Sequence, residues 1–147
     1  YSSEIGTVRS QGVEVGLSGK ITDNLDLVFG FSTFSLKNME SGEKARVNIP
    51  TQTINALASY TVPQLPKLKL GASVKWQDDI QDTSYATITQ DSYALFNLMA
   101  SYEVNNNVLI QVNGNNLTNE KYLTGLSGGQ GYYGASANYN VALKFKY

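Results

Sequence analysis

The sequence predicts an all-β protein, an antiparallel sheet of about seven strands of the kind found in transmembrane β-barrels. Three observations support this fold class. Apolar and polar residues alternate along much of the chain of 147 residues, which is the period of a strand with two different faces. Short turns alternate with long polar loops. No stretch approaches the roughly 18 consecutive apolar residues of a transmembrane helix.

The apolar positions of the predicted strands fall on one face, strand after strand. In the N-terminal half these positions are Val13, Val15, Leu17 and Ile21 in residues 13–21, Leu25, Leu27, Phe29 and Phe31 in 25–32, Ile54, Ala56, Ala58 and Tyr60 in 53–60, and Leu68, Leu70, Ala72, Val74 and Trp76 in 68–76. In the C-terminal half they are Ala94, Phe96, Leu98, Ala100 and Tyr102 in 94–102, Val108, Ile110 and Val112 in 108–115, and Tyr139, Val141, Leu143, Phe145 and Tyr147 in 138–147. We predict no helix.

The opposite face is polar and carries many charges. Its charged members are Glu14, Lys20, Asp26, Lys69, Lys75, Lys144 and Lys146. Such side chains are unfavourable in a packed core but can line a wet or plugged lumen. Because every backbone group in lipid must be paired within a closed sheet, the apolar face is predicted to look outward toward outer-membrane lipid.

The connections alternate in length. Residues 22–24, 63–66 and 105–107 form short turns, whereas residues 37–46, 78–92 and 119–133 form long polar loops. Outer-membrane barrels keep short turns on the periplasmic side and long loops outside. Aromatic residues near the strand ends fit the interfacial girdles of such barrels, although aromatic residues favour strands in general.

Composition excludes several classes of function. Eleven Lys and Arg against twelve Asp and Glu leave the chain nearly neutral, so no nucleic-acid partner is predicted. The chain contains no His and no Cys, which excludes histidine-dependent catalysis, thiolate nucleophiles and disulfides. Lumen-facing Glu14 and Asp26 have no evident carboxylate partner. We therefore predict no enzyme activity, no catalytic residue and no cofactor.

An odd number of antiparallel strands cannot close a simple ring. The chain is therefore predicted to be part of a larger barrel or of an assembly. It opens with Tyr1-Ser2-Ser3-Glu4, without an initiator Met or a signal region, as a piece of a longer precursor would.

The C-terminal third carries motifs of a known family. Residues 116–122, Asn-Leu-Thr-Asn-Glu-Lys-Tyr, resemble the penultimate-strand signature Asn-Leu-x-(Asn/Asp)-x-x-Tyr of TonB-dependent receptors. The ending Phe145-Lys146-Tyr147 resembles the terminal strand of that family, although Gly-Ala-Ser-Ala at 134–137 replaces the usual Pro or Arg. Residues 9–14 and 93–102 resemble two further strand motifs. Their order and spacing are most similar to those of ferric siderophore receptors.

The resemblance implies a barrel of about 22 strands closed by an N-terminal plug. Residues 1–147 would be its C-terminal portion, without the plug. It also implies a Gram-negative outer-membrane location and a ferric siderophore as the transported ligand. The TonB complex would act through the missing N-terminal part, and the outer-membrane assembly machinery would recognise the C-terminal strand.

Aromatic side chains in the long loops are the candidate ligand contacts, because rings can cover an apolar chelate face and phenols can hydrogen-bond its oxygens. The candidates are Trp76, Tyr85, Tyr93, Tyr122, Tyr132 and Tyr133. The spacing of Asp78, Asp79, Asp82 and Asp91 matches no metal-binding loop, so we predict a solvated loop there and no metal site.

Two other functions compete with the receptor. A self-contained porin-like or adhesin barrel subunit, completed by oligomerisation, is disfavoured by the motif at 115–122. A soluble β-sandwich that binds sugar or protein would not show systematic alternation of turn and loop length.

Overall fold

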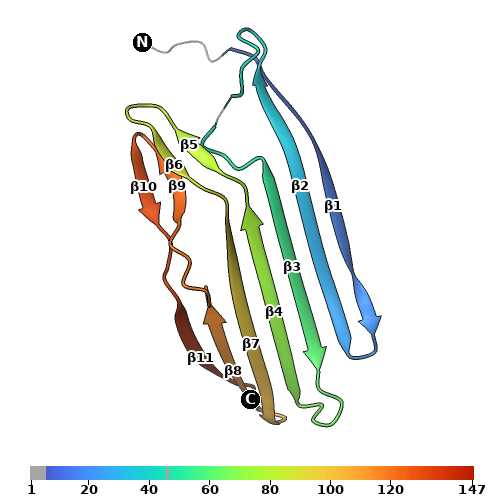
Figure 1. The fold of residues 1–147 in the computed structure, drawn as a ribbon. Helices are drawn as coiled ribbons and strands as arrows, with labels where there is room; N and C mark the ends of the chain where they lie inside the picture. Colours follow the sequence, from blue (N-terminus) through green and yellow to red (C-terminus); the bar gives the residue numbers. More distant parts are fainter. Residues whose placement is uncertain (1–5, 46) are drawn as a thin grey trace.

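The computed structural model describes residues 6–45 and 47–147, and its regular structure is entirely β-strand (Figure 1). Seven antiparallel strands form the main sheet, in the order β1-β2-β3-β4-β7-β8-β11. They are β1 (Val8–Thr22), β2 (Leu25–Asn38), β3 (Gln52–Thr61), β4 (Leu68–Gln77), β7 (Tyr93–Asn105), β8 (Val108–Asn115) and β11 (Asn138–Phe145). The predicted antiparallel all-β class is confirmed, and this sheet is open rather than closed. Among the described residues, no helix is long and apolar enough to span a membrane.

The register gives the sheet one apolar face. Residues directly opposite each other in neighbouring strands point to the same side. Ile54 lies opposite Phe31 on one side and Trp76 on the other, and Val112 lies opposite Ala100 and Val141. These rows continue from β1 to β11, and we call this side the apolar face.

The other side is the polar face. Asn55 lies opposite Lys75, and Lys20 lies opposite Asp26. Side-chain amides bond across the strands here: Asn113 Nδ2 donates to Asn140 Oδ1 at 2.7 Å. The predicted separation of the two faces is therefore present, although Val28 and Leu57, which lie opposite each other, place apolar side chains on the polar face.

The β1–β2 hairpin extends further than the sequence predicts. β1 begins at Val8 instead of residue 13, and β2 continues to Asn38, inside the predicted loop 37–46. Backbone pairing persists after the apolar alternation stops, because polar residues such as Gln11 and Ser35 still pair across the strands. Arg46, the end of that predicted loop, and Tyr1 to Glu4 lie outside the described residues.

The other two predicted loops are not simple loops. Residues 78–92 contain a hairpin of β5 (Ile80–Asp82) and β6 (Ile88–Gln90), and residues 119–133 contain one of β9 (Leu123–Ser127) and β10 (Gln130–Tyr133). Gly128 and Gly129 connect β9 to β10 with φ values of +62° and +74°. A two-residue type I′ hairpin turn needs positive φ at both positions, which glycine supplies without strain.

Burial is concentrated at the loop end of the sheet. The deeply buried residues other than glycine are Gln77, Ile80, Asp82, Tyr93, Asn116 and Leu126, and all of them lie at the loop ends of strands or in the loop hairpins. A single-layer sheet exposes both of its faces, whereas the long loops add a second layer of chain that excludes water. The packed core of the described residues is therefore in the loops.

Candidate functional site

The three long connections join into one unit above the loop end of the sheet, which we call the loop layer (residues 39–45, 47–51, 78–92 and 116–137; Figure 1). Gln81 N donates to Val47 O at 2.9 Å and so joins the first connection to the second. Leu123 N donates to Gln90 Oε1 at 2.7 Å and joins the second to the third. These bonds link residues far apart in sequence, so the three connections hold one another in place.

Asp82 fastens the two loop hairpins to each other. Its Oδ1 accepts hydrogen bonds from Ser84 N at 2.9 Å and Ser84 Oγ at 2.6 Å, and its Oδ2 accepts one from Gly129 N at 3.0 Å. These hydrogen bonds hold the pKa of the Asp82 carboxyl below its ordinary value of 3.8, and the bond from the Ser84 hydroxyl has the largest effect. Asp82 is 4% exposed, so the prediction of a solvated loop is wrong for this residue.

The lowered pKa of the Asp82 carboxyl predicts that the contact between the β5–β6 and β9–β10 hairpins depends on pH. A carboxyl whose pKa is lower in the folded state stabilises that state above the ordinary pKa of 3.8, and the stabilisation is lost as the pH falls through the folded pKa. Spin labels at Thr87 and Ser127 should therefore give a narrow distance distribution at neutral pH that broadens below about pH 3.8. The isosteric variant D82N should show no such transition, and an identical transition in D82N would assign it to another group.

The Asn-Leu-x-Asn-x-x-Tyr segment forms the base of the third loop. Asn116 Nδ2 donates to Glu120 O at 2.8 Å and to Ala135 O at 3.0 Å, and Asn116 Oδ1 accepts from Glu120 N at 2.8 Å. The backbone N of Asn116 donates to Asn97 Oδ1 at 3.0 Å, and this bond connects the loop to β7. Asn116 has a φ of +49°, a conformation that Asn tolerates better than most residues.

The last residue of the motif, Tyr122, contacts Tyr93 at the start of β7 and Gly134 just after β10. The rings of Tyr122 and Tyr93 lie 4.6 Å apart, centroid to centroid. On its other side Tyr122 covers Gly134, where a Cβ atom would lie only 2.0 Å from the ring. Gly134 N also donates to Tyr122 O at 2.8 Å. Only glycine fits at 134 with this ring in place.

The six predicted ligand contacts fall into three groups. Tyr85, Tyr132 and Tyr133 are 87%, 63% and 83% exposed in the loop layer. Tyr93 and Tyr122 stack on each other at the foot of that layer. Trp76 belongs to the apolar face, opposite Ile54 and Ala94. The structure thus brings four of the tyrosines into the loop layer, with Tyr93 directly below them at the start of β7, and leaves Trp76 on the apolar face of the sheet.

Several residues that shape the loop layer are not among those predictions, including Asp82, Gln90, Asn116 and Gly134. The Asn116 motif resembles a family signature, but its hydrogen bonds are not visible in the sequence. Gly134 gives no signal of its own, because its contact with Tyr122 depends on the folded path of the loop. Among the described residues, no group of three or more acidic side chains could hold a metal ion.

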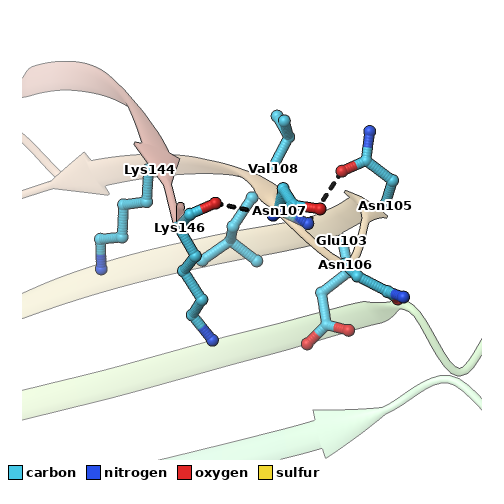
Figure 2. Close-up of a pocket in the computed structure, with 8 residues that line it drawn as sticks. Glu103, Asn105, Asn106, Asn107, Val108, Lys144 and Lys146 are labelled. Atoms are coloured by element: carbon cyan, nitrogen blue, oxygen red, sulfur yellow. Dashed lines mark hydrogen bonds between the residues drawn. The ribbon is translucent and has the colours of Figure 1, made fainter.

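A hollow lies at the opposite, short-turn end of the sheet, between the β7–β8 turn and the end of the chain (Figure 2). It has a volume of about 250 Å³ and contains Glu103, Lys144 and Lys146. Asn107 Nδ2 donates to Lys146 O at 2.8 Å, and Lys146 N donates to Asn107 O at 2.9 Å. These bonds fasten the C-terminal residues to the turn beyond the last strand.

Comparison with known proteins agrees with this architecture. The family model described as TonB dependent receptor-like, beta-barrel, matches residues 1–117. The ferric-pyoverdine BN7/BN8 receptor of Pseudomonas putida is 30% identical over 148 residues, covering 100% of this chain and 18% of that protein. The ferric-pyoverdine 358 receptor of the same organism is 29% identical over 99% of this chain and 18% of its own length.

A solved structure shows the same arrangement of strands. The crystal structure of the siderophore receptor PiuA from Acinetobacter baumannii aligns with a TM-score of 0.82 and 28% identity, covering 95% of this chain and 22% of that one. The chain therefore spans about a fifth of the length of the relatives that it matches.

Proposed function

From the premise that the chain belongs to the TonB-dependent receptor-like β-barrel family, we propose that it is the C-terminal part of an outer-membrane receptor for a ferric siderophore. The observation that carries the proposal is the similarity of nearly the whole chain to receptors named for ferric pyoverdines. Members of this family are outer-membrane receptors and not enzymes, in agreement with the absence of His and Cys.

In this proposal the apolar face contacts lipid and the polar face lines the lumen. The remaining strands of a barrel of roughly 22 strands pair with the edge strands β1 and β11. A plug domain and a TonB-contacting segment belong to other parts of the receptor. The assembly machinery recognises the C-terminal strand β11, which ends at Phe145, together with the aromatic Tyr147 that follows it.

The loop layer supplies part of the siderophore contacts. Tyr85, Tyr132 and Tyr133 are exposed there, and their rings and hydroxyls suit the mixed apolar and polar surface of a ferric chelate. Tyr93 and Tyr122, being stacked, position the loop from below. Trp76 lies on the apolar face and acts at the membrane interface, where Trp is enriched.

The similarity favours this function over a self-contained porin-like or adhesin barrel. A receptor should bind a ferric siderophore tightly and import its iron only in cells with a working TonB complex. The test is ⁵⁵Fe uptake from a panel of ferric siderophores, ferric pyoverdines first, by cells whose only receptor is the full-length protein. Equal uptake with and without TonB, or no uptake of any member of the panel, would contradict the proposal.

The exposed tyrosines give a sharper prediction. The triple variant Y85S/Y132S/Y133S of the full-length receptor should bind its ferric siderophore about 10- to 100-fold more weakly, since aromatic anchors commonly dominate binding. Tryptophan fluorescence quenching of the purified receptor gives the dissociation constant. The matched control is Y60S, because Tyr60 lies on the apolar face near the short turns. Equal weakening in both variants would show a general effect on the barrel.

A further inference from the structure

A row of three cations extends from the β1–β2 hairpin onto the connection that follows it. Arg9 of β1 lies directly opposite Lys37 of β2, and Lys37 lies directly opposite Lys44 in an isolated antiparallel bridge. Residues opposite each other in antiparallel pairs point to the same side, so the three side chains are neighbours on one face. All three are exposed. We call them the basic row.

The members of this row are held close together by the backbone. Asn38 N donates to Glu43 O at 2.9 Å, and Ala45 N donates to Leu36 O at 2.8 Å. These two bonds flank the Lys37–Lys44 pair, which is therefore a non-hydrogen-bonded pair, the kind in which the side chains approach most closely. Like charges placed directly opposite each other destabilise a sheet. A bound anion would remove that repulsion.

The basic row continues the apolar face. In the regular register of β1 and β2, Arg9 and Lys37 alternate in phase with Val15 and Phe31, so they share the side of the sheet that is apolar further down. Between the Val15–Phe31 pair and the Arg9–Lys37 pair, the same side of the sheet carries Gln11 opposite Ser35. From Phe31 to Lys37 the strand rises by about 20 Å. The face thus passes from apolar side chains through an amide and a hydroxyl to cations.

We propose that this part of the β1–β2 hairpin binds an acylated, anionic saccharide, a glycolipid of the outer leaflet. Its acyl chains lie along Phe29 and Phe31, its sugars meet Gln11 and Ser35, and its phosphate or carboxylate groups lie between the cations of the basic row. The site rests on the proposed function in one respect: the long loops must face outward from an outer membrane, as a receptor of this family requires.

Charge and position both favour this occupant. A lipid that only filled the apolar face would not neutralise the basic row, and a soluble anion would not use the apolar residues below it. The ferric siderophore would be bound on the lumen side of the sheet, whereas the basic row is on the lipid side. The alternative is that an acidic residue elsewhere in the receptor pairs with the basic row. In that case glycolipid binding would not depend on the three cations.

The test compares two charge-matched variants of the full-length receptor, purified in detergent. R9Q/K37Q/K44Q removes the basic row, and K20Q/K69Q/K75Q removes three cations of the polar face. Native mass spectrometry with added lipopolysaccharide measures the bound fraction. Because each cation near an anionic membrane surface contributes about fivefold, the first variant should bind roughly 100-fold more weakly and the second should match the unmodified receptor.

A dephosphorylated lipopolysaccharide provides the second probe. It should bind the unmodified receptor more weakly and should bind R9Q/K37Q/K44Q with little further loss. Equal binding of intact lipopolysaccharide by the unmodified receptor and R9Q/K37Q/K44Q would overturn the site. Ferric siderophore binding is measured on the same samples: its absence from the unmodified receptor refutes the proposed function, and its retention in R9Q/K37Q/K44Q separates the two sites.

Discussion

Replacing Asn116 with alanine is expected to lower the free energy of local opening of residues 116–137 by about 3–5 kcal/mol. The side chain makes three hydrogen bonds, to the backbone of Glu120 twice and to Ala135 once. The Asn116 side chain is buried, and each of these hydrogen bonds contributes about 0.5–1.5 kcal/mol. Alanine also fits poorly at a φ of +49°. Hydrogen exchange of the full-length receptor measures the change peptide by peptide.

Two controls separate the contributions of Asn116. Glycine at 116 tolerates the positive φ, so N116G should be about 1 kcal/mol less harmful than N116A while it still lacks the hydrogen bonds. The neighbouring Asn115 donates one bond, 2.9 Å to Asn138 Oδ1, on the exposed polar face, and N115A should have an effect of about 1 kcal/mol or less. If N115A and N116A open the loop equally, the Asn116 hydrogen bonds are not what holds it.

Gly134→Ala is expected to destabilise the same loop by about 2–3 kcal/mol. The added Cβ would lie 2.0 Å from the Tyr122 ring, which must leave its stack on Tyr93 to make room. Because the two tyrosines lie at the foot of the loop layer, their separation should also loosen the β9–β10 hairpin above them. Hydrogen exchange of residues 119–134 gives the change in stability, and ferric siderophore binding gives its functional consequence.

Gly125 provides the matched control for this substitution. It lies in β9, and a Cβ there would meet nothing within 4 Å, so G125A should leave the loop nearly unchanged. A double-mutant cycle identifies the ring as the obstacle: in a Y122A background, G134A should add little further loss. Additive losses from Y122A and G134A would show that the steric conflict involves some other group.

The sequence was sufficient to predict the sheet. Alternation along residues such as Val13, Val15 and Leu17 fixes which side of a strand is apolar, because side chains point alternately to the two faces. The short turns then require neighbouring strands to be antiparallel. The family motif at 116–122 predicted the family itself, which the match over residues 1–117 confirms. The ligand contacts and the missing parts of the receptor stay predictions.

The loop layer could not be predicted in the same way. Residues 78–92 and 119–133 have no apolar alternation to mark the short strands β5, β6, β9 and β10. The β1–β2 hairpin is also longer than its apolar pattern indicates, since pairing of polar residues such as Gln11 with Ser35 leaves no hydrophobic pattern. In both regions backbone pairing forms without an apolar pattern, and in the loop layer hydrogen bonds to distant parts of the chain hold the hairpins in place.

The sequence by itself determined an antiparallel, two-faced sheet and the family to which it belongs, because both depend on the spacing of residues along the chain. Only the tertiary structure decided what each polar or aromatic residue does. It buried Asp82 against Gly129, placed Tyr122 between Tyr93 and Gly134, and put Trp76 on the apolar face. These contacts join residues that are distant in sequence, and their partners are set by the path of the folded loops.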